Sequence, residues 1–114
     1  MPKQDYYQAG QLTDVAYLVL VSLATPKHGY LIMSAIEEMT HGEMKIGPAS
    51  LYTTLKKLTD VGFICLLSDV HKKKTYKLTT KGYEALKVEI RKRERYANFG
   101  KMSLEGSPKS FYKK

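Results

Sequence analysis

The chain has little of what secreted, membrane-spanning or disulfide-stabilised proteins depend on. It contains one cysteine, Cys65, which excludes an internal disulfide and fits a reducing compartment. Its longest apolar run, residues 15–23, is interrupted by Ser22 and is too short to span a bilayer. No basic leader followed by an apolar segment opens the sequence, so no signal peptide is expected. These absences predict a cytoplasmic protein with no membrane partner.

Acidic residues are few, and they are missing altogether from two stretches of the chain. The 114 residues carry 19 Lys and Arg against 11 Asp and Glu, which gives a net charge of +8. Residues 45–58 and 71–81 contain lysines and no acid, whereas Glu37, Glu38 and Glu43 lie upstream of both stretches. Basic charge concentrated in this way favours a polyanionic partner, in the first place a nucleic acid.

The residue patterns of catalysis and metal binding are also missing from the sequence. His28, His41 and His71 are scattered, with no cysteine or carboxylate at metal-ligand spacing. There is no glycine-rich phosphate loop or nucleophile motif. The sequence therefore predicts a protein that is not an enzyme and that uses no cofactor or metal.

What is present suits one small domain with one modest core. We expect a flexible arm at residues 1–10, a winged-helix unit at 11–79, a dimerisation helix at 80–100 and a basic disordered tail at 101–114. The first helix, from Thr13, is apolar nearly all round, which favours cover by a second subunit.

Residues 47–82 predict the order helix, hairpin, helix. Pro48 suits a first helical position, and Leu51, Leu55 and Leu58 form one apolar stripe. The rest of this helix is small, polar and basic, which suits a DNA major groove. The candidate DNA contacts on it are Ser50, Tyr52, Thr53, Thr54, Lys56 and Lys57.

Two strand-like runs, residues 63–69 and 75–78, predict the hairpin. Lys72, Lys73 and Lys74 lie at its tip, where they would contact phosphates and add affinity more than specificity. The fold class expected is therefore mainly α with a small β-hairpin: a winged helix-turn-helix with a three-helix core and a two-stranded wing.

The last helix carries a broken apolar seam. Tyr83, Leu86, Ile90 and Ala97 follow a spacing of three, four and seven, but Arg93 occupies the heptad position between the last two. This pattern predicts a short partner-seeking helix, and Gly100 is its expected end.

Three segments in this order resemble the PadR family of bacterial transcriptional regulators, in particular its short-tailed subfamily with one C-terminal helix. They are HGY at residues 28–30, GPASLYTTLKKLTDVGFI at 47–64 and KTYKLTTKG at 74–82. The sequence departs from the family in two ways: it has no tryptophan, the residue type of an aromatic drug-stacking site in some multidrug-sensing relatives, and Thr53 stands where many members carry proline.

The resemblance implies a winged helix-turn-helix that forms a homodimer through its first and last helices. It implies binding to a pseudo-palindromic operator in double-stranded DNA, usually as a repressor that a small-molecule effector releases. Two alternatives stay open: a winged-helix module that binds a protein partner without specific DNA binding, and a basic domain for RNA or a membrane surface.

Overall fold

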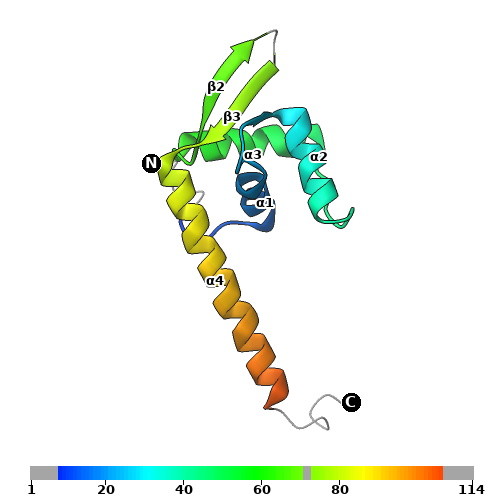
Figure 1. Ribbon diagram of the computed structural model, residues 1–114, viewed down its shortest axis with the longest axis vertical. Helices are drawn as coiled ribbons and strands as arrows, with labels where there is room; N and C mark the ends of the chain where they lie inside the picture. The colour runs from blue at the N-terminus through cyan, green and yellow to red at the C-terminus, as the bar shows by residue number, and fades with distance from the viewer. Residues whose placement is uncertain (1–7, 71–72, 107–114) are drawn as a thin grey trace.

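The computed structural model of the chain describes residues 8–70 and 73–106 (Figure 1). The elements in chain order are α1 (Asp14–Ser22), β1 (Lys27–His28), α2 (Gly29–Met39), α3 (Pro48–Asp60), β2 (Ile64–Val70), β3 (Lys73–Leu78) and α4 (Thr80–Glu105). The predicted class, mainly α with a small β wing, is confirmed.

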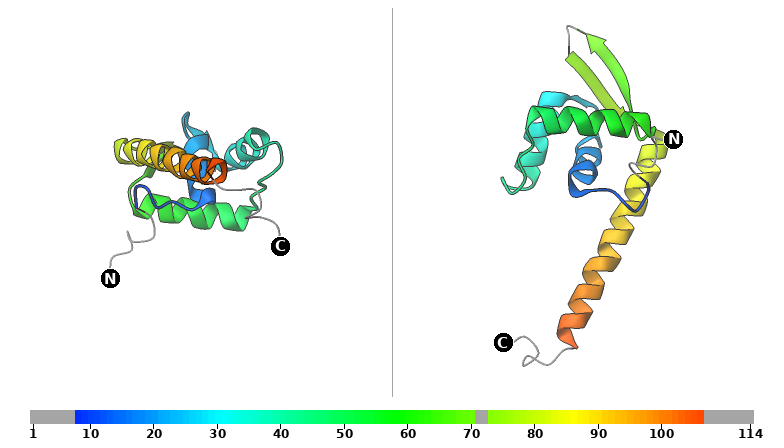
Figure 2. Two further views of the ribbon diagram at one scale, coloured as in Figure 1. Left: turned by 90° about the horizontal axis from the view of Figure 1, so that it is seen from below. Right: turned by 180° about the vertical axis from the view of Figure 1, so that it is seen from behind.

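Helix α1 lies at the centre of the helical body, in contact with α2, α3 and α4 (Figures 1 and 2). Its Ala16, Val19 and Leu20 are fully buried, whereas Tyr17 and Leu18 are only half-buried. The other helices contribute one buried stripe each, because their apolar residues recur every three or four positions. The core consists of Leu12, Ala16, Val19, Leu20, Leu23, Ile32, Ile36, Leu51, Leu55, Leu58, Val61, Phe63, Ile64, Tyr76, Ala85 and Leu86.

The sheet is antiparallel, with the order β1-β3-β2. Strands β2 and β3 form the predicted hairpin, which projects from the helical body as the wing (Figure 1). The third strand, β1, was not predicted, because two residues are too few to show an alternating pattern. It pairs Lys27 with Tyr76 and His28 with Thr75, so it joins the start of α2 to the wing.

The start of α4 is fixed against the end of α3. The Thr79 hydroxyl caps α4 by accepting a hydrogen bond from the Gly82 N–H, and it donates one to the Gly62 carbonyl. Gly82 packs so closely that an added Cβ would lie 1.8 Å from the carbonyl oxygen of Phe63. Lys81 donates a hydrogen bond to the Val61 carbonyl at 2.8 Å, which satisfies a free carbonyl at the end of α3.

Helix α4 continues past Gly100, so the prediction that it ends there is wrong. A glycine inside a helix costs only about 0.5–1 kcal/mol, and the good helix formers Lys101 and Met102 follow this one. Residues 101–105, expected in the tail, are therefore helical. Residues 1–7 of the arm expected at 1–10, and residues 107–114 of the tail expected at 101–114, lie outside the described residues.

We call residues 94–105 of α4 the projecting end and the remaining described residues the body. Every residue of the projecting end is exposed. The molecule measures 60 × 32 × 25 Å with a radius of gyration of 17.0 Å, against roughly 13 Å for a compact domain of this length. The excess reflects the single helix that extends from the body (Figure 2).

Candidate nucleic-acid interface

Helix α3 owes its orientation to its leucines. Gly47 is its N-cap and Pro48 occupies its first turn, where a missing N–H costs nothing. Leu51, Leu55 and Leu58 are at most 1% exposed, and they turn the opposite face of the helix outward.

The outward face carries most of the predicted contact residues of α3. Ser50, Tyr52, Thr53 and Lys56 are exposed, and Lys57 is half-buried. Thr54 is only 7% exposed, so the prediction that it lies on this face is wrong. At 100° per residue it falls beside Leu58 at the edge of the buried stripe, where a threonine methyl packs well.

The lysine Lys56 on the outward face forms only a weak ion pair within the protein. Lys56 forms one ion pair, Nζ to Asp60 Oδ2 at 3.4 Å, and its side chain stays 75% exposed. An exposed pair of this kind is worth at most about 1 kcal/mol, so it competes weakly with a phosphate. Lys56 can therefore exchange its carboxylate partner for an external anion.

The wing carries the second predicted group. Lys73 and Lys74 are exposed at the start of β3, opposite Val70 and Asp69 of β2. A register shift between Leu66 and Ser68 marks a β-bulge, a feature that increases the local twist of a strand. Lys72 lies outside the described residues.

The fold brings the wing lysines together with the start of α2. A cavity of about 390 Å³ is lined by His28, Gly29, Tyr30, Tyr52, Lys73 and Lys74. Sequence reasoning did not place residues 28–30 here, because the contact depends on the β1–β3 pairing. The only signal for them was the HGY motif.

Tyr52 lies against the start of α2. A Cβ added to Gly29 would lie 2.5 Å from the Tyr52 hydroxyl oxygen, so only glycine permits this approach. On its other side, Tyr52 shares a surface hollow with Leu66 and the largely buried Tyr76. Burial raises the pKa of Tyr76, and the neighbouring Tyr52 and Asp69 raise it further.

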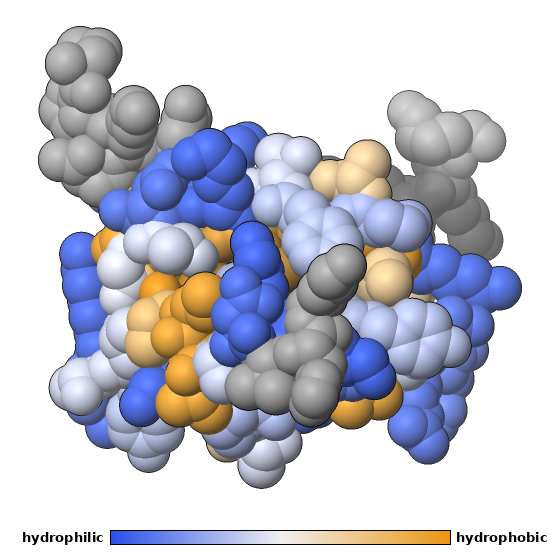
Figure 3. Space-filling view, turned by 90° about the horizontal axis from the view of Figure 1, so that it is seen from above, coloured by the Kyte–Doolittle hydropathy of each residue, from blue (hydrophilic) through white to orange (hydrophobic). Residues whose placement is uncertain are grey.

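On the face seen from the wing side, hydrophilic residues lie around the rim and apolar residues gather toward the middle (Figure 3). Leu66 and Leu67 of β2 are 45% and 49% exposed. The acids Glu37, Glu38 and Glu43 belong to α2 and the loop after it, outside α3 and the wing. These three acids therefore lie apart from the wing lysines, whereas Asp60 of α3 and Asp69 of β2 are acids within the candidate interface.

A cluster of charged groups ties α4 to the start of α1. The Glu89 side chain is 1% exposed and accepts hydrogen bonds from the Leu12 N–H at 3.2 Å and from Arg93 Nε at 2.7 Å. Arg93 also donates to Asp14 at 2.8 Å and to the Leu12 carbonyl at 3.1 Å. Its guanidinium carbon lies 4.2 Å from the centroid of the Tyr17 ring. We call Leu12, Asp14, Glu89 and Arg93 the clamp.

The carboxylates of the clamp favour the charged form of Arg93. Burial alone would lower the pKa of Arg93, but hydrogen bonds to Asp14 and Glu89 outweigh it and raise the pKa. In the seam predicted for α4, Arg93 was only an interruption. The structure shows why a cation occupies that position.

Beyond the clamp, the projecting end presents apolar side chains to solvent. Tyr96, Phe99, Met102 and Leu104 are 57–62% exposed. The Tyr96 and Phe99 rings lie 5.8 Å apart. Tyr96, Phe99 and Met102 share one side of the helix, and no other helix or strand covers them among the residues that the structure describes. Their printed neighbours belong to α4 itself: Lys92 Nζ lies 5.1 Å from the centroid of the Tyr96 ring, and the Asn98 amide donates to Met102 Sδ at 3.4 Å.

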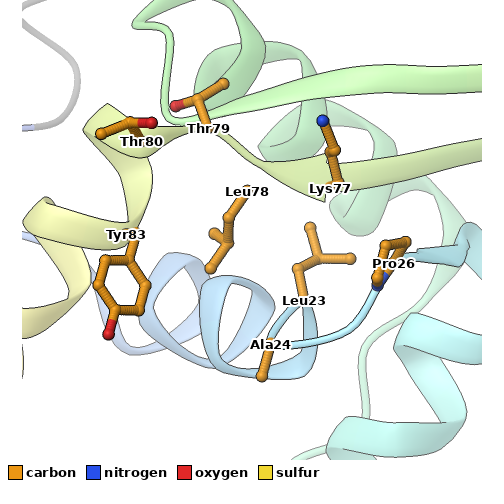
Figure 4. A pocket seen from close by; sticks show the side chains of 8 residues that line it. All are labelled: Leu23, Ala24, Pro26, Lys77, Leu78, Thr79, Thr80 and Tyr83. Atoms are coloured by element: carbon orange, nitrogen blue, oxygen red, sulfur yellow. The ribbon is translucent and has the colours of Figure 1, made fainter.

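One further hollow lies where α1, β3 and α4 meet. Figure 4 shows the side chains around it, which come from the loop after α1, from β3 and from the start of α4. It encloses about 350 Å³ and is lined by Leu23, Ala24, Pro26, Lys77, Leu78, Thr79, Thr80 and Tyr83.

Among residues 8–70 and 73–106, no three His, Cys, Asp or Glu side chains come together as a metal site. None of the helices described is long and apolar enough to cross a membrane.

Comparisons with known proteins agree on one family. A family model described as the transcriptional regulator PadR-like family matches residues 18–88. PadR of Bacillus subtilis, solved in complex with operator DNA, is 31% identical with a TM-score of 0.59, over 67% of this chain and 46% of that one.

Two more distant structures share the fold. A transcriptional regulator from Clostridium thermocellum is 23% identical with a TM-score of 0.63, over 82% of this chain and 93% of that one. RosR of H. salinarum is 20% identical with a TM-score of 0.66, over 88% of this chain and 100% of that one. A search of curated proteins finds no match.

Proposed function

The chain belongs to the PadR-like family of transcriptional regulators, and from this premise we propose that it is a homodimeric repressor that binds a specific DNA operator. One observation carries the proposal: the exposed side of α3, which has no acid before Asp60 at its end, lies beside the exposed wing lysines Lys73 and Lys74. The 31% identical PadR of Bacillus subtilis, solved with operator DNA, supports it.

In the proposed complex, α3 enters a major groove. Ser50 and Thr53 are exposed and donate hydrogen bonds to base edges or phosphates. Lys56 and Lys57 contribute positive charge on the same side. Tyr52 contacts the backbone from its place against α2, and Lys72, Lys73 and Lys74 contact phosphates from the wing.

Two copies are needed for an operator of useful length. We propose that residues 11–79 form the DNA-binding unit and that α4 and α1 form the dimer interface. The exposed Tyr96, Phe99 and Met102 of the projecting end and the half-buried Tyr17 and Leu18 support this arrangement, because neighbouring exposed apolar side chains favour burial by a partner. Two-fold symmetry then places the recognition helices about 34 Å apart on inverted half-sites.

Release of the operator by a small-molecule effector completes the proposal. Aromatic residues of α1 and α4 support it, since Tyr83 lines the hollow of Figure 4 and Tyr17 lines another hollow beside Arg93. These hollows adjoin the helices proposed for the dimer interface. Ligand binding there would therefore alter the relation between the two DNA-binding units.

Selection of bound sequences from random duplex DNA tests the function. We expect an enriched inverted repeat, and operator affinity should fall with log salt with a slope of roughly −5 to −9, from about six to ten neutralised phosphates. No enriched repeat would overturn the proposal and favour a winged-helix module for a protein partner. A flat salt response would overturn the electrostatic role of the lysines.

A further inference from the structure

We propose that the clamp sets which operator spacing the protein accepts, with Arg93 as the positioning residue. This inference rests on the proposed function, because spacing has meaning only for a dimer that reads two half-sites. It concerns a residue that touches no DNA and lies outside α3 and the wing.

Two attachment points determine the direction in which α4 leaves the body. The first is its start, where Gly82 packs on the Phe63 backbone and Thr79 caps the helix. The second is the clamp, one to two turns beyond the last apolar core residue, Leu86. Residues 82 and 93 are separated by about 16 Å along a helix, and two points this far apart fix an axis.

Arg93 is the centre of the second attachment. Its guanidinium donates to the Glu89 and Asp14 carboxylates and to the Leu12 carbonyl, and its face covers the Tyr17 ring. A planar fork of donors makes these contacts simultaneously, and a lysine ammonium cannot. Glu89 in turn holds the Leu12 N–H, so one side chain connects α4 with the segment leading into α1.

The projecting end converts a small change of direction into a large displacement. From Gly82 to Glu105 the helix extends about 35 Å, so a tilt of 10° moves its tip by roughly 6 Å. One base pair advances about 3.4 Å along DNA. If the projecting ends join two copies, a loosened clamp therefore changes the separation of the recognition helices by an amount comparable to one or two base pairs.

The experiment measures affinity against spacing. The operator obtained by selection is remade with one or two base pairs inserted or removed between its half-sites, and fluorescence anisotropy gives Kd for each. The affinity of the wild-type protein should fall about tenfold or more on a mis-spaced site, because its two recognition helices can no longer bind both half-sites at once. The affinity of the Arg93→Gln variant should vary by no more than about threefold across the series, and this variant should still bind the original operator.

Arg91→Gln is the matched control, because Arg91 is exposed two residues before Arg93 on the same helix and lies outside the projecting end. It should keep the wild-type profile. Arg93→Lys retains the charge but not the fork and should resemble Arg93→Gln. An Arg93 variant with the wild-type profile would overturn the inference while leaving the proposed function intact.

If Arg93→Gln does not fold, as judged by far-UV circular dichroism and light scattering, Asp14→Asn tests the same point by weakening one exposed contact of the clamp. Its profile should broaden, and an unchanged profile would count against the clamp. A flat profile for the wild-type protein would instead overturn the proposed two-site binding itself.

Discussion

The body and the projecting end of α4 differ in how they use apolar residues. In the body, the leucine, isoleucine and valine side chains of the core are enclosed by neighbouring elements. In the projecting end, Phe99 and Met102 are 57% and 60% exposed although they lie in the same helix as the buried Leu86. One helix thus completes the core of the body with its first half and exposes apolar side chains for a partner with its second half. The boundary between the two halves falls at Arg93.

A pair of glycine substitutions should separate the two regions most strongly. Gly82→Ala should destabilise the body by about 3 kcal/mol, because its Cβ would collide with backbone rather than with a movable side chain. Gly100→Ala should stabilise the protein by about 0.5–1 kcal/mol, because the space around Gly100 is open. Chemical denaturation of both variants measures the difference, and equal effects would contradict it.

A charge in the apolar face should break assembly without unfolding the body. Phe99→Asp should produce monomers and weaken operator binding by about 100-fold, because the second half-site is no longer held nearby. Lys101→Asp, on the opposite side of the helix, is the control. Light scattering gives the oligomeric state, and a Phe99→Asp dimer with full affinity would remove the projecting end from the interface.

Loss of the wing lysines should weaken DNA binding without affecting assembly. Lys73→Ala with Lys74→Ala should leave assembly unchanged and reduce the salt slope by about 1 for each phosphate contact removed. Specific and non-specific DNA should be affected alike. Lys87→Ala with Lys92→Ala, on α4, removes the same charge and should alter the slope less; an equal reduction would mean that net charge alone matters.

The smallest effect expected contrasts two adjacent threonines of α3. Thr53→Val should weaken the operator complex by roughly 3- to 10-fold, since it removes one exposed donor without disturbing the core. Thr54→Val should leave DNA affinity within about twofold, because its side chain faces the buried stripe. The reverse order in a binding titration would show that α3 rotates when it docks.

Sequence periodicity was sufficient for the helices and the wing, because their buried stripes repeat at the spacing of each element. It failed where position depends on distant contacts. Thr54 lies at the margin of a stripe, so an angle of a few tens of degrees decides its burial. Strand β1 is a strand only because it pairs with β3. At Gly100 the glycine predicts a helix end, but the helix continues through it.

The candidate site divides in the same way. The exposed residues of α3 were predictable because they are what remains after the leucines are assigned. The proximity of Tyr52 to Gly29, and of both to the wing lysines, was not, since three separate elements meet there. The role of Arg93 was hidden for a further reason: its partners Leu12 and Asp14 are about 80 positions away.

That separation also bears on how the molecule is made. The Leu12 N–H and the Glu89 carboxylate are 77 positions apart, so they meet only after most of the chain has been synthesised. During synthesis, the winged-helix elements can collapse first, and α1 acquires its last neighbour when α4 arrives. The segment leading into α1 is therefore secured late, and a chain that stops before residue 89 can form the DNA-reading elements without the attachment that orients them.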